Sequence, residues 1–221
     1  MKKIGFIVLV ISLFASLALK AADTTTTTKV DPKKIEAEQK KVQSMLDKFV
    51  TSLNKDPKAY TILVEGNDVL NAYATIGKKI VVFTGLIDSL KNQSALAFVV
   101  AHELGHIEER HSINGMVRTG VLSLIGAAFF KEKTVASNVY GAAANLGSLH
   151  YSRGAEKEAD MFAVAIMNKL YCNVPGKLEF FEKNAANQKS PKIAEYFSTH
   201  PLDTTRIEYL KKAITDAGCK A

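Results

Sequence analysis

The sequence predicts a mainly helical α+β domain with a small β-sheet, and three observations carry that prediction. Three short runs rich in β-branched and aromatic residues fall between residues 60 and 85, apolar residues recur at helical spacing through much of the remaining chain, and no internal repeat is visible. Because the strands are few and do not alternate with helices, we expect a small sheet rather than a doubly wound one. The 221 residues favour one substantial domain with a sizeable core.

The N-terminal segment is expected to lie outside that domain. Residues 1–21 run from two lysines through an uncharged apolar stretch to small residues, which is the order of a secretory signal peptide. The apolar stretch is shorter than the roughly 20 residues of a spanning helix. We therefore expect cleavage and a periplasmic or secreted product, with an uncleaved N-terminal anchor as the alternative. Residues 22–32 are threonine-rich and predict a flexible linker, which leaves residues 33–221 as the domain.

The charge balance argues against nucleic acid as a partner. The whole chain carries a formal charge of +7, and removal of residues 1–21 takes away three lysines and no acidic residue, so the charge falls to +4. That excess is mild, and no basic stripe interleaved with aromatic residues accompanies it.

Two cysteines, Cys172 and Cys219, remain in this exported chain. Exported proteins meet an oxidising compartment, so we expect a single Cys172–Cys219 disulfide, with two free buried thiols as the alternative.

The elements are expected in a simple order. A helix follows the linker, because Asp31 and Pro32 suit the cap and first position of a helix and an apolar stripe continues to Leu53. Three strands follow in a meander, at residues 60–65, 69–75 and 80–85. One long helix is then expected from Ser94 to His111, and later helices at residues 154–170, 177–185 and 204–218.

Residues 115–150 contain two weakly polar stretches rich in small residues, joined at a charged bend. Neither approaches the length of a spanning helix. The favoured interpretation is a packed helical hairpin, and peripheral contact with a membrane is the alternative.

The stretch AHELGH (101–106) contains the candidate metal ligands and the candidate general base. His102 and His106 lie about 40° apart and one turn along a helix, so their imidazoles can converge on one ion. Neutral imidazole is a common zinc ligand. Glu103 follows the first histidine and can reach a reacting water without occupying the metal, which is the position of a general base in metal-assisted hydrolysis. The stretch lies in a strongly apolar helix, where an unpartnered histidine or glutamate would be costly to bury.

The spacing after His106 excludes the metzincin class. That class needs a glycine three residues later and a histidine six residues later, where this chain has Glu109 and Ser112. His111 lies about 140° around a continuous helix from His106. We therefore expect His111 to end the helix at its carboxyl terminus, where positive charge is favoured.

A third metal ligand is less obvious from spacing. The candidates are His150, His200, Glu156 and Glu158. Glu156 is narrowly favoured because Asp160 follows it by one helical turn, so that one carboxylate can bind the metal while the other orients a ligating histidine.

Five stretches occur in order along the chain: NAYA (71–74), TGLIDSL (84–90), FVVAHELGHIEERH (98–111), YSRGAEKEAD (151–160) and THPLDTTRIEYL (199–210). In these stretches the chain resembles the HtpX and CAAX prenyl protease family of zinc metallopeptidases, and within it the exported BepA- and LoiP-like branch. The H-E-x-x-H block and the S-R-x-x-E-x-E-A-D block together are far more specific than either alone. The resemblance implies a zincin-type (gluzincin) metallopeptidase domain.

The resemblance also implies roles for single residues. His102, His106 and Glu156 would bind one zinc ion per chain, Glu103 would be the base, and Asp160 would orient a ligand.

Two further residues, His200 and Arg206, would lie near the active site by the same resemblance. There they would contact reacting groups, and His200 can gate the site. The competing interpretations are a turn residue before Pro201 for His200 and a structural ion-pair partner for Arg206.

The expected function is zinc-dependent endoproteolysis in envelope protein quality control. Polypeptides, including misfolded envelope proteins, would be the substrates, and the predicted strand at residues 80–85 would pair with the substrate backbone. The alternative is a non-catalytic, zinc-containing chaperone or assembly factor of the cell envelope. An intact Glu103 argues against that alternative, because a structural metal site has no need of a base.

Overall fold

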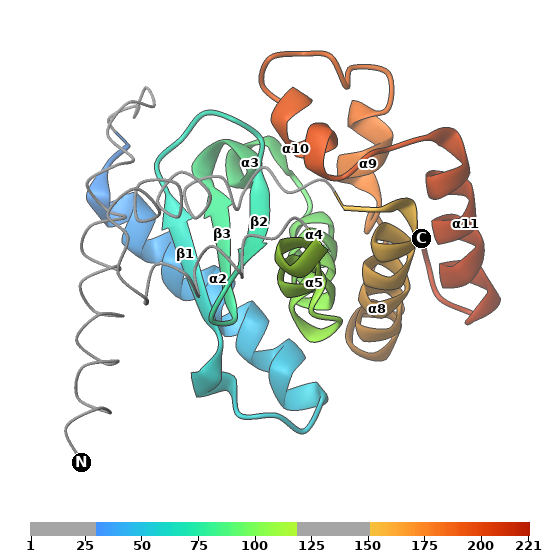
Figure 1. The fold of residues 1–221 in the computed structure, drawn as a ribbon, viewed down its shortest axis with the longest axis horizontal. Helices are drawn as coiled ribbons and strands as arrows, with labels where there is room; N and C mark the ends of the chain where they lie inside the picture. Colours follow the sequence, from blue (N-terminus) through green and yellow to red (C-terminus); the bar gives the residue numbers. More distant parts are fainter. Residues whose placement is uncertain (1–29, 119–150) are drawn as a thin grey trace.

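The computed structural model describes residues 30–118 and 151–221, and its mainly helical α+β architecture confirms the predicted fold class (Figure 1). The sheet has three strands, β1 (Thr61–Glu65), β2 (Ala72–Thr75) and β3 (Lys79–Phe83). Their order is β1-β3-β2, with β1 parallel and β2 antiparallel to β3. The predicted meander order is therefore wrong, because the chain crosses from one edge of the sheet to the other before β3 returns between them.

The helices occupy most of the predicted positions. Two of them, α3 and α10, are short helices that the sequence pattern did not predict, and the predicted helix from Ser94 to His111 is divided into α4 and α5. The helices are α2 (Pro32–Ser52), the 3-10 turn η1 (Pro57–Ala59), α3 (Thr84–Ser89), α4 (Gln93–Glu108), α5 (His111–Arg118), α8 (Arg153–Tyr171), α9 (Glu179–Asn184), α10 (Ala194–Thr199) and α11 (Thr204–Asp216). The predicted signal peptide, most of the linker and most of the predicted hairpin lie outside the described residues.

Helix α2 covers the β1 edge of the sheet. Its N-terminus is capped by the Asp31 side chain, which accepts a hydrogen bond from Lys33 N, and its apolar stripe enters the core. Two glutamines of α2 accept hydrogen bonds from the outer amides of β1: Gln43 from Ile62 N (2.7 Å) and Gln39 from Val64 N (2.7 Å). The β1 edge is thus closed to further strand pairing.

The opposite edge, β2, lies beside α4. The predicted substrate strand at residues 80–85 corresponds to β3, which has neighbours on both sides and cannot accept another strand. Of the two edges, only β2 adjoins the helix that carries the H-E-x-x-H motif (Figure 1).

Helix α4 is the centre of the molecule. Figure 1 shows the sheet, α4, α8 and α11 succeeding one another across the fold, and every residue of α4 from Ser94 to His106 is buried. Gly105 makes the close approach to α8 possible, because a Cβ at that position would lie 2.9 Å from Ala159 Cα. The small residue therefore sets how near the two helices, and their polar side chains, can come.

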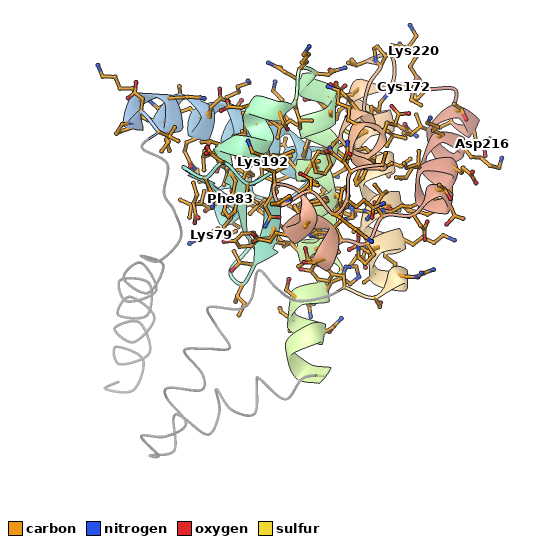
Figure 2. The ribbon with its side chains drawn as sticks, turned by 90° about the horizontal axis from the view of Figure 1, so that it is seen from above. Lys79, Phe83, Cys172, Lys192, Asp216 and Lys220 are labelled. Carbon is orange, nitrogen blue, oxygen red and sulfur yellow. A yellow bond between two sulfur atoms is a disulfide. The ribbon has the colours of Figure 1, made fainter. Side chains whose placement is uncertain are left out.

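The C-terminal segment is fastened to the end of α8. The sulfurs of Cys172 and Cys219 lie 2.05 Å apart, at disulfide distance, as the sequence predicts. Lys220 N donates to Cys172 O (2.9 Å), and Figure 2 shows these two labelled residues on the same side of the molecule. The buried Lys177 ammonium donates to the carbonyl oxygens of Val174 (2.7 Å) and Cys172 (3.2 Å).

Among the described helices, none has the length and apolar character to span a bilayer.

Candidate metal centre

The two histidines of the motif face each other on α4. Their Nε2 atoms lie 3.0 Å apart, and both side chains are fully buried between the sheet and α8. Burial is also the largest influence on His106, and it moves the pKa of this imidazole well below its ordinary value. A neutral ring with a free lone pair is the form that binds a metal.

Helix α8 brings Glu156 to the same point. Ser152 caps this helix by accepting a hydrogen bond from Ala155 N, which places Glu156 in the first turn. The Glu156 carboxylate lies 3.3 Å from His106 Nε2 and 3.6 Å from His102 Nε2. Burial opposes its ionisation, but the charges that His200 and His102 carry when protonated lower the pKa of Glu156 well below its usual range.

His200 completes a cluster of four potential ligands. It follows α10, and its Nδ1 lies 3.0 Å from Glu156 Oε1 and 3.3 Å from His102 Nε2. One ligand atom from each of His102, His106, Glu156 and His200 lies within 4.8 Å of the others, and all four side chains are buried. His200 is therefore part of the site in space, and not an isolated turn residue.

Asp160 lies one turn beyond Glu156 on α8 and faces the other nitrogen of His102. Its Oδ1 is 2.9 Å from His102 Nδ1, and Arg206 from α11 donates two hydrogen bonds to the carboxylate, both 2.8 Å. Tyr209 donates a further hydrogen bond to Oδ2. Burial opposes ionisation here too, but Arg206 and His102 lower the pKa of Asp160 to about 2.

Arg206 joins the two carboxylates. Besides its hydrogen bonds to Asp160, its Nη1 lies 2.7 Å from Glu156 Oε2, and its side chain is almost fully buried. It is an ion-pair partner, and it acts on the cluster through the carboxylates that it holds.

Glu103 points from α4 toward strand β2. Its Oε2 accepts a hydrogen bond from the outer amide of Ala74 (2.9 Å), whereas its Oε1 has no hydrogen-bond partner among the described residues. That free oxygen lies 3.5 Å from His200 Nε2, which also lacks a partner there. Burial is the main cause that raises the pKa of Glu103. A buried carboxylate with one oxygen tethered and one oxygen free is suited to accept a proton.

Two tyrosines that the sequence reasoning missed line the cluster. Tyr151 stacks on the His106 ring, with centroids 3.8 Å apart, and Tyr196 stacks on the His200 ring at 4.6 Å. Tyr151 is the first residue of the YSRGAEKEAD stretch, and Tyr196 lies shortly before the THP turn. Their proximity in sequence to these motifs is the one sequence feature that could have indicated a place near the site. Of the other candidate ligands, Glu158 has an exposed side chain outside the cluster. His150 lies outside the described residues.

The convergence of nitrogen and oxygen ligand atoms indicates that a cation fits this cluster. Nδ1 of His102 lies 2.9 Å from Oδ1 of Asp160, and Nδ1 of His106 lies 3.0 Å from Nδ1 of His111. When both rings are neutral with their protons on Nδ1, the two Nε2 atoms present lone pairs to each other at 3.0 Å, beside the Glu156 carboxylate. Converging acceptors without a donor are unfavourable when buried, and a metal ion satisfies them.

Two imidazoles from H-E-x-x-H and a glutamate from a second helix define a metallopeptidase-type site. The match to known proteins gives the same class: the model of peptidase family M48 matches residues 36–214, and this chain belongs to that family. The resemblance noted in the sequence is thereby confirmed.

Named relatives are similar over most of this chain but are longer. The chain is 26% identical over 178 residues to a beta-barrel assembly-enhancing protease of Yersinia pestis, covering 75% of this chain and 37% of the relative. It is 27% identical over 178 residues to the protein of that name from Escherichia coli K12, with the same coverage. It is 28% identical over 200 residues to the mitochondrial metalloendopeptidase OMA1 of Saccharomyces cerevisiae, covering 80% of this chain and 56% of the relative.

Proposed function

We propose that this chain is a zinc-dependent metalloendopeptidase with one zinc ion per chain, acting on polypeptides in envelope protein quality control. The observation that carries the proposal is the convergence of His102, His106 and Glu156 beside a glutamate with a free oxygen. Two imidazoles and one carboxylate are the ligand set of zinc peptidases that leave one position open. Membership of family M48 and the names of the relatives support the same activity.

In this proposal each side chain has a separate task. A bound zinc ion would supply a Lewis acid that polarises the scissile carbonyl. Glu103 takes a proton from the attacking water at Oε1 and passes it to the leaving amine, while Ala74 N holds Oε2 in place. Asp160 orients His102, and Arg206 holds Asp160 and Glu156.

His200 faces the space between Glu156 and Glu103. Its Nε2 is the group placed to contact the reacting carbonyl once a substrate is present. In the absence of substrate, its Nδ1 is close enough to the ligand atoms to gate the metal.

Strand β2 is the edge that the substrate would meet. Among the described strands, β1 is covered by α2 and β3 is central, so an extended polypeptide would add at β2, next to Glu103, to which the Ala74 amide donates. This replaces the strand at residues 80–85 as the proposed pairing edge. Backbone pairing recognises any extended chain, which agrees with misfolded polypeptides as substrates.

The proposed envelope location is supported by the leader-like residues 1–21 and by the beta-barrel assembly named in the relatives from Yersinia pestis and Escherichia coli. We propose a periplasmic or secreted product of signal peptide cleavage. Peripheral membrane contact through residues 115–150 belongs to the same proposal and is tested by liposome flotation.

The decisive variant is Glu103→Gln, which keeps the shape of the side chain and removes its basicity. We expect it to retain zinc and to lose casein cleavage by a factor of about 10² or more. Glu208→Gln, an exposed position on α11, is the matched control and should cleave as wild type does. The rival function, a zinc-containing chaperone, predicts that the wild type suppresses aggregation without cleaving casein and that Glu103→Gln changes neither property.

A further inference from the structure

The two motif histidines are supported in different ways. His102 Nδ1 faces a buried carboxylate directly, that of Asp160. Within residues 30–118 and 151–221, no carboxylate lies beside Nδ1 of His106. Instead its Nδ1 lies 3.0 Å from Nδ1 of His111, and Nε2 of His111 lies 2.9 Å from Oε2 of Glu158. Ligating histidines usually donate their second nitrogen to a carboxylate, a carbonyl or water, so an interposed imidazole requires an explanation.

The interruption between α4 and α5 creates this contact. Helix α4 ends at Glu108, and Arg110 adopts a left-handed conformation (φ 57°), so the chain turns before α5 begins. His111 is therefore the first residue of the next helix and returns to His106, and the prediction that it ends the preceding helix is wrong. On a continuous helix these two side chains would have pointed apart.

One arrangement of protons along the row His106–His111–Glu158 is consistent with metal binding at His106. A neutral imidazole has one N–H and one lone pair. A metal bound at Nε2 of His106 requires the ring proton to be on Nδ1, from which it can be donated to Nδ1 of His111 at 3.0 Å. The proton of His111 is then on Nε2, where it is donated to the carboxylate of Glu158. Each donor in the row meets an acceptor.

A second contact fixes the tilt of the His106 ring. Tyr151 stacks on the ring with an interplanar angle of 19°, and its hydroxyl lies 2.9 Å from Oγ of Ser112, the neighbour of His111. Stacking alone leaves rotation within the ring plane free. The hydrogen bond to His111 removes that freedom.

We propose that His111 is a positioning residue that fixes the tautomer and orientation of His106 for metal binding, with Glu158 as the anchor of the row. The proposal rests on the metal centre described above and extends it to a surface group, since the Glu158 side chain is 65% exposed. Metal affinity at the buried site then depends on a carboxylate at the surface that is not itself a ligand.

Zinc affinity of the full mature chain, measured by competition with a chromophoric chelator, tests this directly. His111→Phe keeps a ring but neither nitrogen, and we expect it to bind zinc about 10- to 100-fold more weakly than wild type. His111→Asn restores an acceptor close to the position of Nδ1 and should recover most of that loss. Glu158→Gln should fall between wild type and His111→Phe. Glu36→Gln, at an exposed ion pair with Lys40 on α2, is the control and should match wild type.

A second readout uses the metal-free protein. Two-bond ¹H–¹⁵N correlation spectra report which ring nitrogen carries the proton. We expect Nδ1–H at His106 and Nε2–H at His111, and loss of the Nδ1–H preference of His106 in His111→Phe.

Wild-type zinc affinity in both His111→Phe and Glu158→Gln, or an Nε2–H tautomer of His106 in the metal-free wild type, would overturn the inference. Because Glu158 is a surface position, Glu158→Gln remains informative if His111→Phe does not fold. If wild-type protein binds no zinc, the proposed function fails, while the tautomers still decide whether the row of hydrogen bonds exists.

Discussion

Replacing Asp160 by Asn removes the carboxylate that contacts Arg206, Tyr209 and His102, and it keeps the shape of the side chain. Asp160 is fully buried, accepts two hydrogen bonds of 2.8 Å from Arg206 and one from Tyr209, and faces His102 Nδ1. Asn retains one acceptor but leaves the buried guanidinium with Glu156 as its one charged partner among the described residues. Removing one partner of a buried ion pair costs about 3–5 kcal/mol.

The assay is thermal unfolding of the oxidised protein in the presence of chelator, so that loss of metal does not enter the comparison. For a domain of this size, 1 kcal/mol shifts Tm by about 2–4 °C, so Asp160→Asn should lower Tm by about 6–20 °C. Asp216→Asn is the matched control: it lies on the outer side of α11 (Figure 2), in an exposed ion pair with Lys212, and should change stability by less than about 1 kcal/mol.

The pH dependence follows from the same carboxylate. Its pKa is about 2 in the fold against an ordinary 3.8, so its contribution is complete above about pH 4 and is lost as the pH falls through 2. A difference of this size corresponds to about 2 kcal/mol. The gap in stability between wild type and Asp160→Asn should therefore narrow as the pH falls from 4 to 2. Equal Tm values at pH 7, or a gap that widens with acid, would refute this account of the network.

Three other predictions concern the disulfide, the packing of α4 against α8 and the third metal ligand. Replacing Cys172 and Cys219 by Ser opens a loop with a sequence separation of 47, and in the chain-entropy model this should lower the free energy of unfolding by about 4 kcal/mol in a denaturant titration. Gly105→Ala should destabilise by about 1–3 kcal/mol and weaken zinc binding, because its Cβ would press on Ala159 of α8, whereas Gly154→Ala, whose Cβ would meet only Ser152 Oγ at 3.8 Å, should fold and bind zinc as wild type does. Glu156→Gln should lower the zinc content measured by plasma emission, and an unchanged content would move the third ligand elsewhere.

Local periodicity was sufficient to predict most of the helices and to place part of the site. The 3.6-residue repeat places His102 and His106 together on any regular helix, and the same repeat relates Glu156 to Asp160. Both helices are regular where these residues lie, so the spacing carried over to the structure. The predicted strand ranges were also close to those observed. The predicted pairing order was wrong, because β1 pairs with β3 rather than with the next strand in sequence, and turn signals do not encode which strands pair.

The other wrong or missing predictions concern residues whose positions are not determined by helical periodicity. Arg110 adopts a positive φ that its residue type does not predict, and this single turn moved His111 from the end of one helix to the start of the next. Spacing offered His200 only as one of four candidate third ligands and did not favour it, because its place beside Glu156 and His102 depends on tertiary packing that a local pattern does not encode. Tyr151 and Tyr196 give no pattern of their own. Their roles become visible only when their rings are seen against His106 and His200.

The central claim is that one metal ion is held jointly by α4 and α8. Anomalous diffraction at the zinc edge, from crystals of the zinc-loaded protein, tests it most directly. We predict a single strong peak per chain, at about 2.0–2.2 Å from Nε2 of His102, Nε2 of His106 and the carboxylate of Glu156. No peak at this position, or a peak bound by the histidines with Glu156 out of reach, would contradict the account.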